Sequence, residues 1–247
     1  QGELNLSSSA LDDVLLHALG DAPNPHTAVL IAPYPIGTRR LATASHIISV
    51  DAAGVISIPP DAPALRTVHG VDPDGGWVEL GGSFEVHVMG GCVPPPPRDV
   101  ALGAGRLAVA TELAAASRAM LDLARDHAMN RIQFGKPIAS FQAVRHRLAD
   151  ALIAVASAEA AVDAAWLEPS PYTAAMAKAI AGHSARTVAR HAQQVLAGMG
   201  FTSEHPFHRY FRRILALDEL LGSAAELSTK MGSEAIRDRT IPAMLKL

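Results

Sequence analysis

The stretch 131–142 concentrates the most unusual chemistry of the chain between two long segments rich in Ala and Leu. Arg131 supplies a permanently charged, forked donor, Gln133 an amide, and Phe134 a flat ring, while a Gly and a Pro follow at once. Such groups suit a ligand that combines phosphates with a ring system. The stretch predicts a binding loop.

A second loop of special composition covers residues 197–203, after the pair Gln193-Gln194. Gly198 and Gly200 allow backbone N–H groups to approach an anion closely. Taken alone, the same glycines also fit an ordinary helix C-cap.

The segments around these loops are predicted to be helices, because apolar residues recur three and four positions apart. The expected helices cover residues 100–131, 141–166, 172–196 and 206–231. Three connectors favour an up-down-up-down four-helix bundle, in which the first and third connectors share one end. Helices of this length separate the two bundle ends by roughly 40 Å. Both unusual loops should therefore lie together, far from Gly105 and Leu221.

The first hundred residues have a different texture. One short helix is expected near residues 11–20, and strand-length apolar runs follow between turn formers. The runs are 28–32, 46–50, 54–58, 76–80 and 84–89. A hairpin is expected at 46–55 and a solvated turn at 71–76, which includes Asp72 and Asp74. The strands should be mostly antiparallel.

The predicted fold class is α+β and mainly α. Residues 1–22 are interpreted as a short helical remnant, 23–97 as a reduced β domain, and 98–247 as the four-helix bundle. The run Pro94–Pro97 would act as the linker, since neither a ladder nor a helix tolerates four missing donors.

Composition excludes several classes of protein. The 247 residues are 49% hydrophobic and 18% charged, with a formal charge of −3, which does not fit a nucleic-acid binder. Neither a membrane span nor a signal peptide is expected. The single Cys92 fits a small buried residue and a cytoplasmic location.

Other site types lack a full set of residues. His205 and His208 have helical spacing without a third metal ligand nearby, and Asp72 and Asp74 lack the remaining acids of a calcium loop. Gly103-Ala104-Gly105 lacks the third glycine and the strand of a dinucleotide fingerprint. No metal site is predicted.

Two ordered motifs carry a family resemblance. The first is 124–138, Ala-Arg-Asp-His-Ala-Met-Asn-Arg-Ile-Gln-Phe-Gly-Lys-Pro-Ile, with Phe141-Gln142 and Leu148-Ala149-Asp150 after it. The second is 194–202, Gln-Val-Leu-Ala-Gly-Met-Gly-Phe-Thr, followed by Glu204-His205-Pro206. Together they resemble the C-terminal helical domain of acyl-CoA dehydrogenases over about residues 98–232.

The resemblance implies an FAD-dependent flavoenzyme fold, in dimers where the bundle of one subunit touches the FAD of its neighbour. Acyl-CoA thioesters, as in fatty acid β-oxidation, would be the substrates. The residues that would meet FAD are Arg131, Gln133, Phe134, Gln142, Gln194 and Gly198.

The departures from the family concern catalysis. The family's Thr-Glu-Pro and Trp-Ile-Thr/Ser segments around the flavin ring are missing, and its N-terminal helical domain is reduced to one helix. The base that removes the α-proton is a Glu whose two family positions are Leu221 and Gly105 here. Glu219 is a weak substitute, because it would point about 200° around the helix from the expected direction.

These features resemble the degenerate subunit of actinobacterial heterotetramers that act on steroid side-chain CoA thioesters. The chain would complete the FAD site of a catalytic homologue. Two alternatives remain: a self-sufficient homo-oligomer with an unusual base, and a flavin-free scaffold on the same fold. A sequence with residues missing upstream of Gln1 is also considered.

Overall fold

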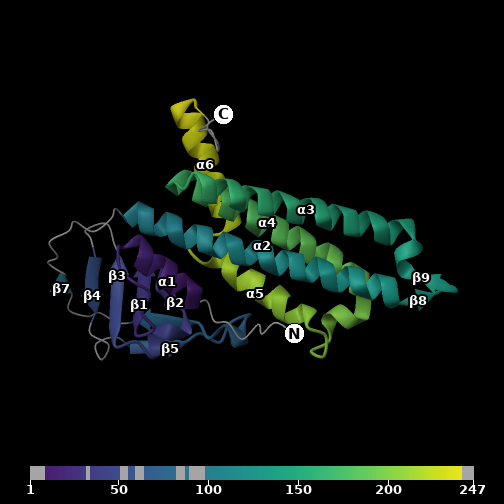
Figure 1. Cartoon of the computed structure of the whole chain (residues 1–247), viewed down its shortest axis with the longest axis horizontal. Helices are drawn as coiled ribbons and strands as arrows, with labels where there is room; N and C mark the ends of the chain where they lie inside the picture. The colour runs from purple at the N-terminus through teal and green to yellow at the C-terminus, as the bar shows by residue number, and fades with distance from the viewer. Residues whose placement is uncertain are drawn as a thin grey trace.

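The computed structural model of the chain describes residues 9–31, 34–50, 55–58, 64–81, 87–88 and 98–240. Two of the three described sheets and the first helix gather at one end, and long helices run from there to the far end, where the third sheet lies (Figure 1). The helices are α1 Ser9–Ala18, α2 Arg98–Asn130, α3 Gln142–Leu167, α4 Pro171–Leu196, α5 Phe207–Glu219 and α6 Ala224–Asp238. The mainly helical α+β class predicted from the sequence is confirmed.

The strands are short. They are β1 Thr27–Ile31, β2 Ile36–Gly37, β3 His46–Val50, β4 Val55–Ile58, β5 Ala64–Thr67, β6 Val78–Gly81, β7 His87–Val88, β8 Ile132–Gln133 and β9 Lys136–Pro137. Four 3-10 turns connect them with the helices: η1 Arg39–Ala42, η2 Pro73–Gly75, η3 Ile138–Ser140 and η4 Ala197–Phe201.

In the described part of the β region, pairing is mostly antiparallel, as predicted. One sheet has the order β1-β3-β4-β7 and another the order β2-β6-β5. The predicted hairpin is present, since β3 and β4 pair with Val50 opposite Val55, although its turn lies outside the described residues. The pairing of β1 with β3 is parallel, which the sequence did not reveal.

Strand β1 is buried on both faces and joins the β region to the bundle. Val29 and Ile31 belong to the large core that includes the bundle, whereas Ala28 and Leu30 belong to a smaller cluster. Asp12 of α1 accepts a hydrogen bond from the Val29 N–H at 2.9 Å. One apolar core therefore runs from the sheets into the helices. The predicted domain division stays a prediction, and its linker Pro94–Pro97 lies outside the described residues.

The bundle helices pack through small residues. Helix α4 lies against both α2 and α3, and its buried positions are largely alanines, which allow close approach. Helix α4 begins at a capping box in which Ser170 and Thr173 bond reciprocally, with Pro171 at its first position. Helix α2 is long and apolar enough to cross a membrane, yet 67% of its most apolar window is buried in the protein.

The prediction of one fourth helix over 206–231 is wrong. The structure has α5 and α6 in its place, because the chain turns at Leu221 (φ 59°) and Gly222 (φ 99°). Ser223 then starts α6 through a capping box with Glu226. Helix α5 completes the up-down-up-down bundle, whereas α6 packs on α4 and rises away from it (Figure 1).

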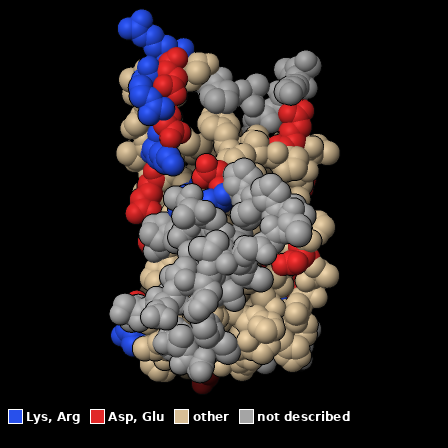
Figure 2. All heavy atoms as spheres, turned by 90° about the vertical axis from the view of Figure 1, so that its left-hand side faces the viewer, with Lys and Arg blue, Asp and Glu red and all other residues tan. Residues whose placement is uncertain are grey.

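The outer part of α6 is a solvated surface. Acidic and basic atoms lie side by side on the portion that rises above the rest of the molecule (Figure 2). They include the pairs Lys230–Glu234 and Arg237–Asp238. Among the described residues, Leu227 and the partly buried Met231 fix α6 by apolar contact with two alanines of α4.

Candidate functional site

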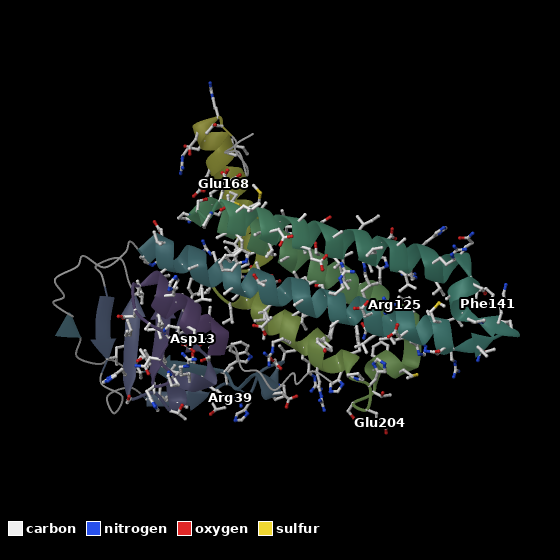
Figure 3. All side chains as sticks on the ribbon, in the orientation of Figure 1. Asp13, Arg39, Arg125, Phe141, Glu168 and Glu204 are labelled. Atoms are coloured by element: carbon white, nitrogen blue, oxygen red, sulfur yellow. The ribbon has the colours of Figure 1, made fainter. Side chains whose placement is uncertain are left out.

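The first and third connectors lie at one end of the bundle, as the topology predicted. Phe141, just after the first connector, and Glu204, just after η4, both lie at that end, whereas Asp13 and Glu168 lie toward the other (Figure 3). Electrostatic contacts also indicate that the two connectors are close to each other. The pKa of His127, at the end of α2, is lowered by burial and by the nearby His205 and Arg131, which come from the two connector regions. We call this end, residues 129–142 and 194–205, the loop end.

The first connector is a tight hairpin with an aromatic residue at its tip. Strands β8 and β9 pair Gln133 with Lys136, so Phe134 and Gly135 form the two-residue turn, with φ of 52° and 77°. Positive φ is unfavourable for a residue other than Gly, Asn or Asp. The Phe134 side chain is 90% exposed and meets Phe141 edge-on at 6.0 Å between ring centroids. An exposed ring on a strained backbone favours a binding role.

The polar residues predicted for this connector are available to a ligand. Arg131, Gln133 and Gln142 are all exposed. Among the residues that the structure describes, the Arg131 guanidinium has neither a hydrogen-bond partner nor an ion pair. A free guanidinium beside an exposed ring can hold an anionic group and cover a flat one.

The third connector offers open backbone. A Cβ added at Gly198 would meet nothing within 4 Å, and Gln194 on the last turn of α4 is exposed. Gly200, in contrast, is buried against Leu196 and serves the fold. Of the two glycines predicted to approach a ligand, only Gly198 is placed to do so.

The loop end also has exposed apolar side chains that the sequence reasoning missed. They are Met129, Ile132, Met199 and Phe201. Exposed apolar side chains on two connectors at one end of the bundle are of the kind that an interaction site uses. Their spacing alone gave no signal, because each fits an ordinary helix end.

At the opposite end, Gly105 and Leu221 lie in contact. A Cβ on Gly105 would stand 2.7 Å from Leu221 Cδ1 and 3.1 Å from Leu15 Cδ2. Leu221 is 5% exposed and belongs to the core. The Leu221 side chain occupies the space that a side chain at position 105 would need, and neither residue carries an acidic or basic group.

Two buried cations hold the turn that carries Leu221. Arg106 Nε donates to the Leu221 carbonyl at 2.9 Å, and Lys178 Nζ donates to the carbonyls of Asp218 and Gly222 at 2.9 and 2.6 Å. Burial lowers the pKa of Arg106 and lowers the pKa of Lys178 to about 8. We call this region, Gly105, Arg106, Lys178 and residues 218–223, the junction. The sequence reasoning missed Lys178, whose signal is a lone cation in the alanine stripe of α4.

The nearby carboxylates point elsewhere. Glu219 is exposed and lies 3.6 Å from Arg186, while Glu226 accepts a hydrogen bond from the Ser223 N–H. Asp218 is buried, pairs with Arg186 at 2.7 Å and accepts from the Ala224 N–H. None of the three stands at the contact between Gly105 and Leu221.

A further buried pair connects the β region to α5. Arg213 Nε donates to Asp72 Oδ2 at 2.6 Å, and Trp77 Nε1 donates to the same oxygen at 3.2 Å. The prediction of a solvated turn is therefore wrong for Asp72, which long-range pairing buries. Within the described ranges, no group of three His, Cys, Asp or Glu residues could hold a metal ion.

Comparison with known sequences now decides the family. A sequence profile described as acyl-CoA dehydrogenase, C-terminal domain, matches residues 99–231, which is more than half of the chain. The chain belongs to the acyl-CoA dehydrogenase family. Enzymes of this family depend on FAD.

Individual relatives cover part of their own length. The chain is 38% identical to acyl-CoA dehydrogenase IpdE2 of Mycobacterium tuberculosis over 139 residues. This matched segment covers 56% of the present chain and 43% of IpdE2. The chain thus matches less than half the length of this curated relative.

Solved structures share the fold. The ChsE4–ChsE5 complex of Mycobacterium tuberculosis matches with a TM-score of 0.68 and 24% identity over 89% of this chain and 64% of that one. A variant of the Tcur3481–Tcur3483 steroid ACAD matches with a TM-score of 0.70 and 22% identity, over 86% of this chain and 63% of that one. At such identities the likeness concerns the acyl-CoA dehydrogenase fold alone.

The two ends of the bundle differ in how they fit the family's cofactor. The loop end has a free guanidinium, exposed amides, an exposed ring and an open glycine, which fit the phosphate and adenine part of FAD. The junction instead places Leu221 against Gly105 through apolar atoms, and this contact has no acid–base group. The donor set of the loop end fits the phosphate and adenine groups of the cofactor.

Proposed function

We propose that this chain completes the FAD site of a homologous catalytic acyl-CoA dehydrogenase subunit and supplies no base of its own. The observation that carries the proposal is the apolar contact between Gly105 and Leu221, the two positions of the family base. A Cβ added to Gly105 would stand 2.7 Å from Leu221 Cδ1, so the two residues leave no room for a carboxylate between them. The loop end supports it, because its polar groups are free for a ligand that another chain holds.

The residues of the loop end would each have one task. Arg131 would pair with a phosphate oxygen, and Phe134 would cover the adenine ring. Gln194 and the backbone N–H groups near Gly198 would hold the same region from the other connector. Gln133 and Gln142 would add amide donors. FAD, when bound, supplies the acceptor for the hydride that leaves the β-carbon of an acyl thioester.

The junction would act by leaving the base to the partner. Removal of the α-proton needs a carboxylate in reach of that carbon. Leu221 is held in the core, where Arg106 donates to its carbonyl, and Asp218 and Glu219 pair with Arg186. In this proposal no side chain of the junction takes up this proton. In this proposal the partner subunit provides the carboxylate, and the substrate is a CoA thioester of a fatty acid or a steroid side chain. The name of the Tcur3481–Tcur3483 steroid ACAD supports the second class.

Co-expression with a homologue that retains the Glu tests the proposal. The complex should purify as a hetero-oligomer with about one FAD per two chains, since each site needs one of each. A homo-oligomer that carries its own FAD and dehydrogenates an acyl-CoA would contradict it. Absence of flavin from every assembly would favour the scaffold alternative.

Introducing the missing base gives a second test. If Leu221→Glu conferred activity on the isolated chain, its own flavin-ring site would be functional and the proposal would be wrong. The proposal expects no turnover from this variant alone.

A further inference from the structure

A hollow lies between α1 and the bundle, on a different side of α2 from the junction. It has a volume of about 420 Å³, and its walls come from α1, the first turns of α2, the end of α3 and the start of α4. Small-molecule pockets in proteins usually span roughly 300–1,000 Å³. The hollow thus has the size of a ligand site, and the proposed function does not use it.

The walls are apolar and fixed in place. Val14, Val100, Ala104 and Leu107 line the hollow with Trp166. The Trp166 indole is held by its Nε1–H, which donates to Thr111 Oγ1 at 3.2 Å. Pro169 lies in the turn between α3 and α4, and Pro171 is the first residue of α4, so both restrict the backbone there. Such walls form a pocket that exists before a ligand arrives.

The polar groups of the lining are almost all engaged within the protein. Asp13 accepts from Arg40 Nη1 at 2.7 Å, and Ser170 is occupied by the capping box with Thr173. Among the described residues, the His17 ring of this lining has no hydrogen-bond partner. His17 is exposed, so its imidazole lies at the rim of the hollow, and the rest of the lining is mostly apolar.

We propose that this hollow binds a compact apolar molecule with one polar end group, which lies against His17. A long polar or multiply charged ligand would leave its groups unpaired against the apolar wall, at a cost of several hydrogen bonds. A short acyl chain or a fused ring with a single acidic group has the matching chemistry. The inference does not rest on flavin binding, so it stands or fails separately from the proposed function.

Binding of 1-anilinonaphthalene-8-sulfonate tests the site, because this probe joins two ring systems to one sulfonate. Titration of the wild-type chain should give saturable emission with one probe per chain, and octanoic acid should displace it. Energy transfer from Trp166 should accompany binding and fall in Trp166→Phe, which leaves Trp77 as the other tryptophan of the chain. Non-saturable emission, or transfer that survives Trp166→Phe unchanged, would overturn the proposal.

Matched variants place the site. Ala104→Leu fills the hollow and should weaken the probe by about tenfold or more, since added methyl groups take its space. Ala115→Leu adds the same groups on an exposed position of the same helix and should stay within about twofold. Val100→Trp fills the hollow from its exposed rim and serves if Ala104→Leu does not fold.

Equal affinity of the filling variants and the wild type would overturn the proposal. Binding should also persist when the chain is assembled with a homologous subunit. Loss of the probe on assembly would show that a protein surface covers the hollow, and this too would overturn the proposal.

Discussion

The two ends of the helical bundle treat their polar groups in opposite ways. At the loop end, Arg131 has no partner among the described residues, and Phe134 is 90% exposed on a strained turn. At the junction, Arg106 and Lys178 are buried and donate to backbone carbonyls. A buried charge must be satisfied inside the fold, whereas an exposed unpaired one remains available to a ligand. The difference separates residues that hold the structure from residues that await another molecule.

Two arginines give the largest contrast. Arg213 is buried and bonded to Asp72, so Arg213→Met leaves that carboxylate buried without its charged partner. The free energy of unfolding should fall by roughly 3–5 kcal/mol, the usual cost of breaking a buried pair. Urea denaturation measures it. A loss below about 1 kcal/mol would mean that the β region and α5 are not held together by this pair.

Arg131→Ala should show the reverse pattern. Loss of a charge-assisted hydrogen bond to a phosphate should weaken FAD retention in the hetero-oligomer by roughly 1.5–3 kcal/mol. Unfolding of the isolated chain should change by less than about 0.5 kcal/mol, because Arg131 is exposed.

The flavin content after dialysis measures this loss of retention. Arg125→Ala is the matched control at the same end, since Arg125 pairs with Asp122 and Asp126. Equal flavin content in Arg131→Ala and the wild type would remove Arg131 from the site.

Gly105 at the junction and Gly198 at the loop end allow the same comparison between the two bundle ends with uncharged residues. A methyl group on Gly105 would press on Leu221 and Leu15, so Gly105→Ala should destabilise the chain by about 1–3 kcal/mol. Gly198→Ala meets open space and should be nearly neutral. Thermal unfolding measures both. The double variant Gly105→Ala/Leu221→Ala should recover part of the loss, and simple additivity would contradict contact between these positions.

The pH dependence of stability gives the smallest effect. Burial lowers the pKa of Lys178 to about 8 in the folded chain, from 10.5 for a solvated lysine, so the unfolded chain binds more protons between these pH values. Stability therefore rises with pH there, and wild type should gain roughly 1 kcal/mol over Lys178→Met between about pH 7 and pH 9. Urea denaturation at both pH values measures the difference. Parallel curves for the two proteins would show that Lys178 is not buried as an ammonium group.

The sequence predicted the bundle and the loop end because both depend on local patterns. Apolar spacing of three and four marks the helices, and Gly135 with Gly198 marks the connectors that interrupt them. The placement of Arg131 near the third connector followed from topology alone. The residue roles at the FAD site stay predictions.

The missed features depend on contacts between distant segments. Leu221 has no turn propensity, and its positive φ is maintained by Arg106 and Lys178 from two other helices. Asp72 is buried because Arg213, far along the chain, reaches it. The parallel pairing of β1 with β3 likewise joins strands that are not consecutive in the chain. Tertiary contacts of this kind leave no periodic trace in the sequence.

The central claim is that this chain contributes binding groups and no base. The most direct measurement is turnover of an acyl-CoA by the hetero-oligomer after the catalytic Glu of the co-expressed homologue is changed to Gln. Because removal of a general base costs about 10²–10⁴-fold in rate, turnover should fall by at least that much. Retention of about half of the wild-type turnover would contradict the account, since it would show a second functional base in this chain.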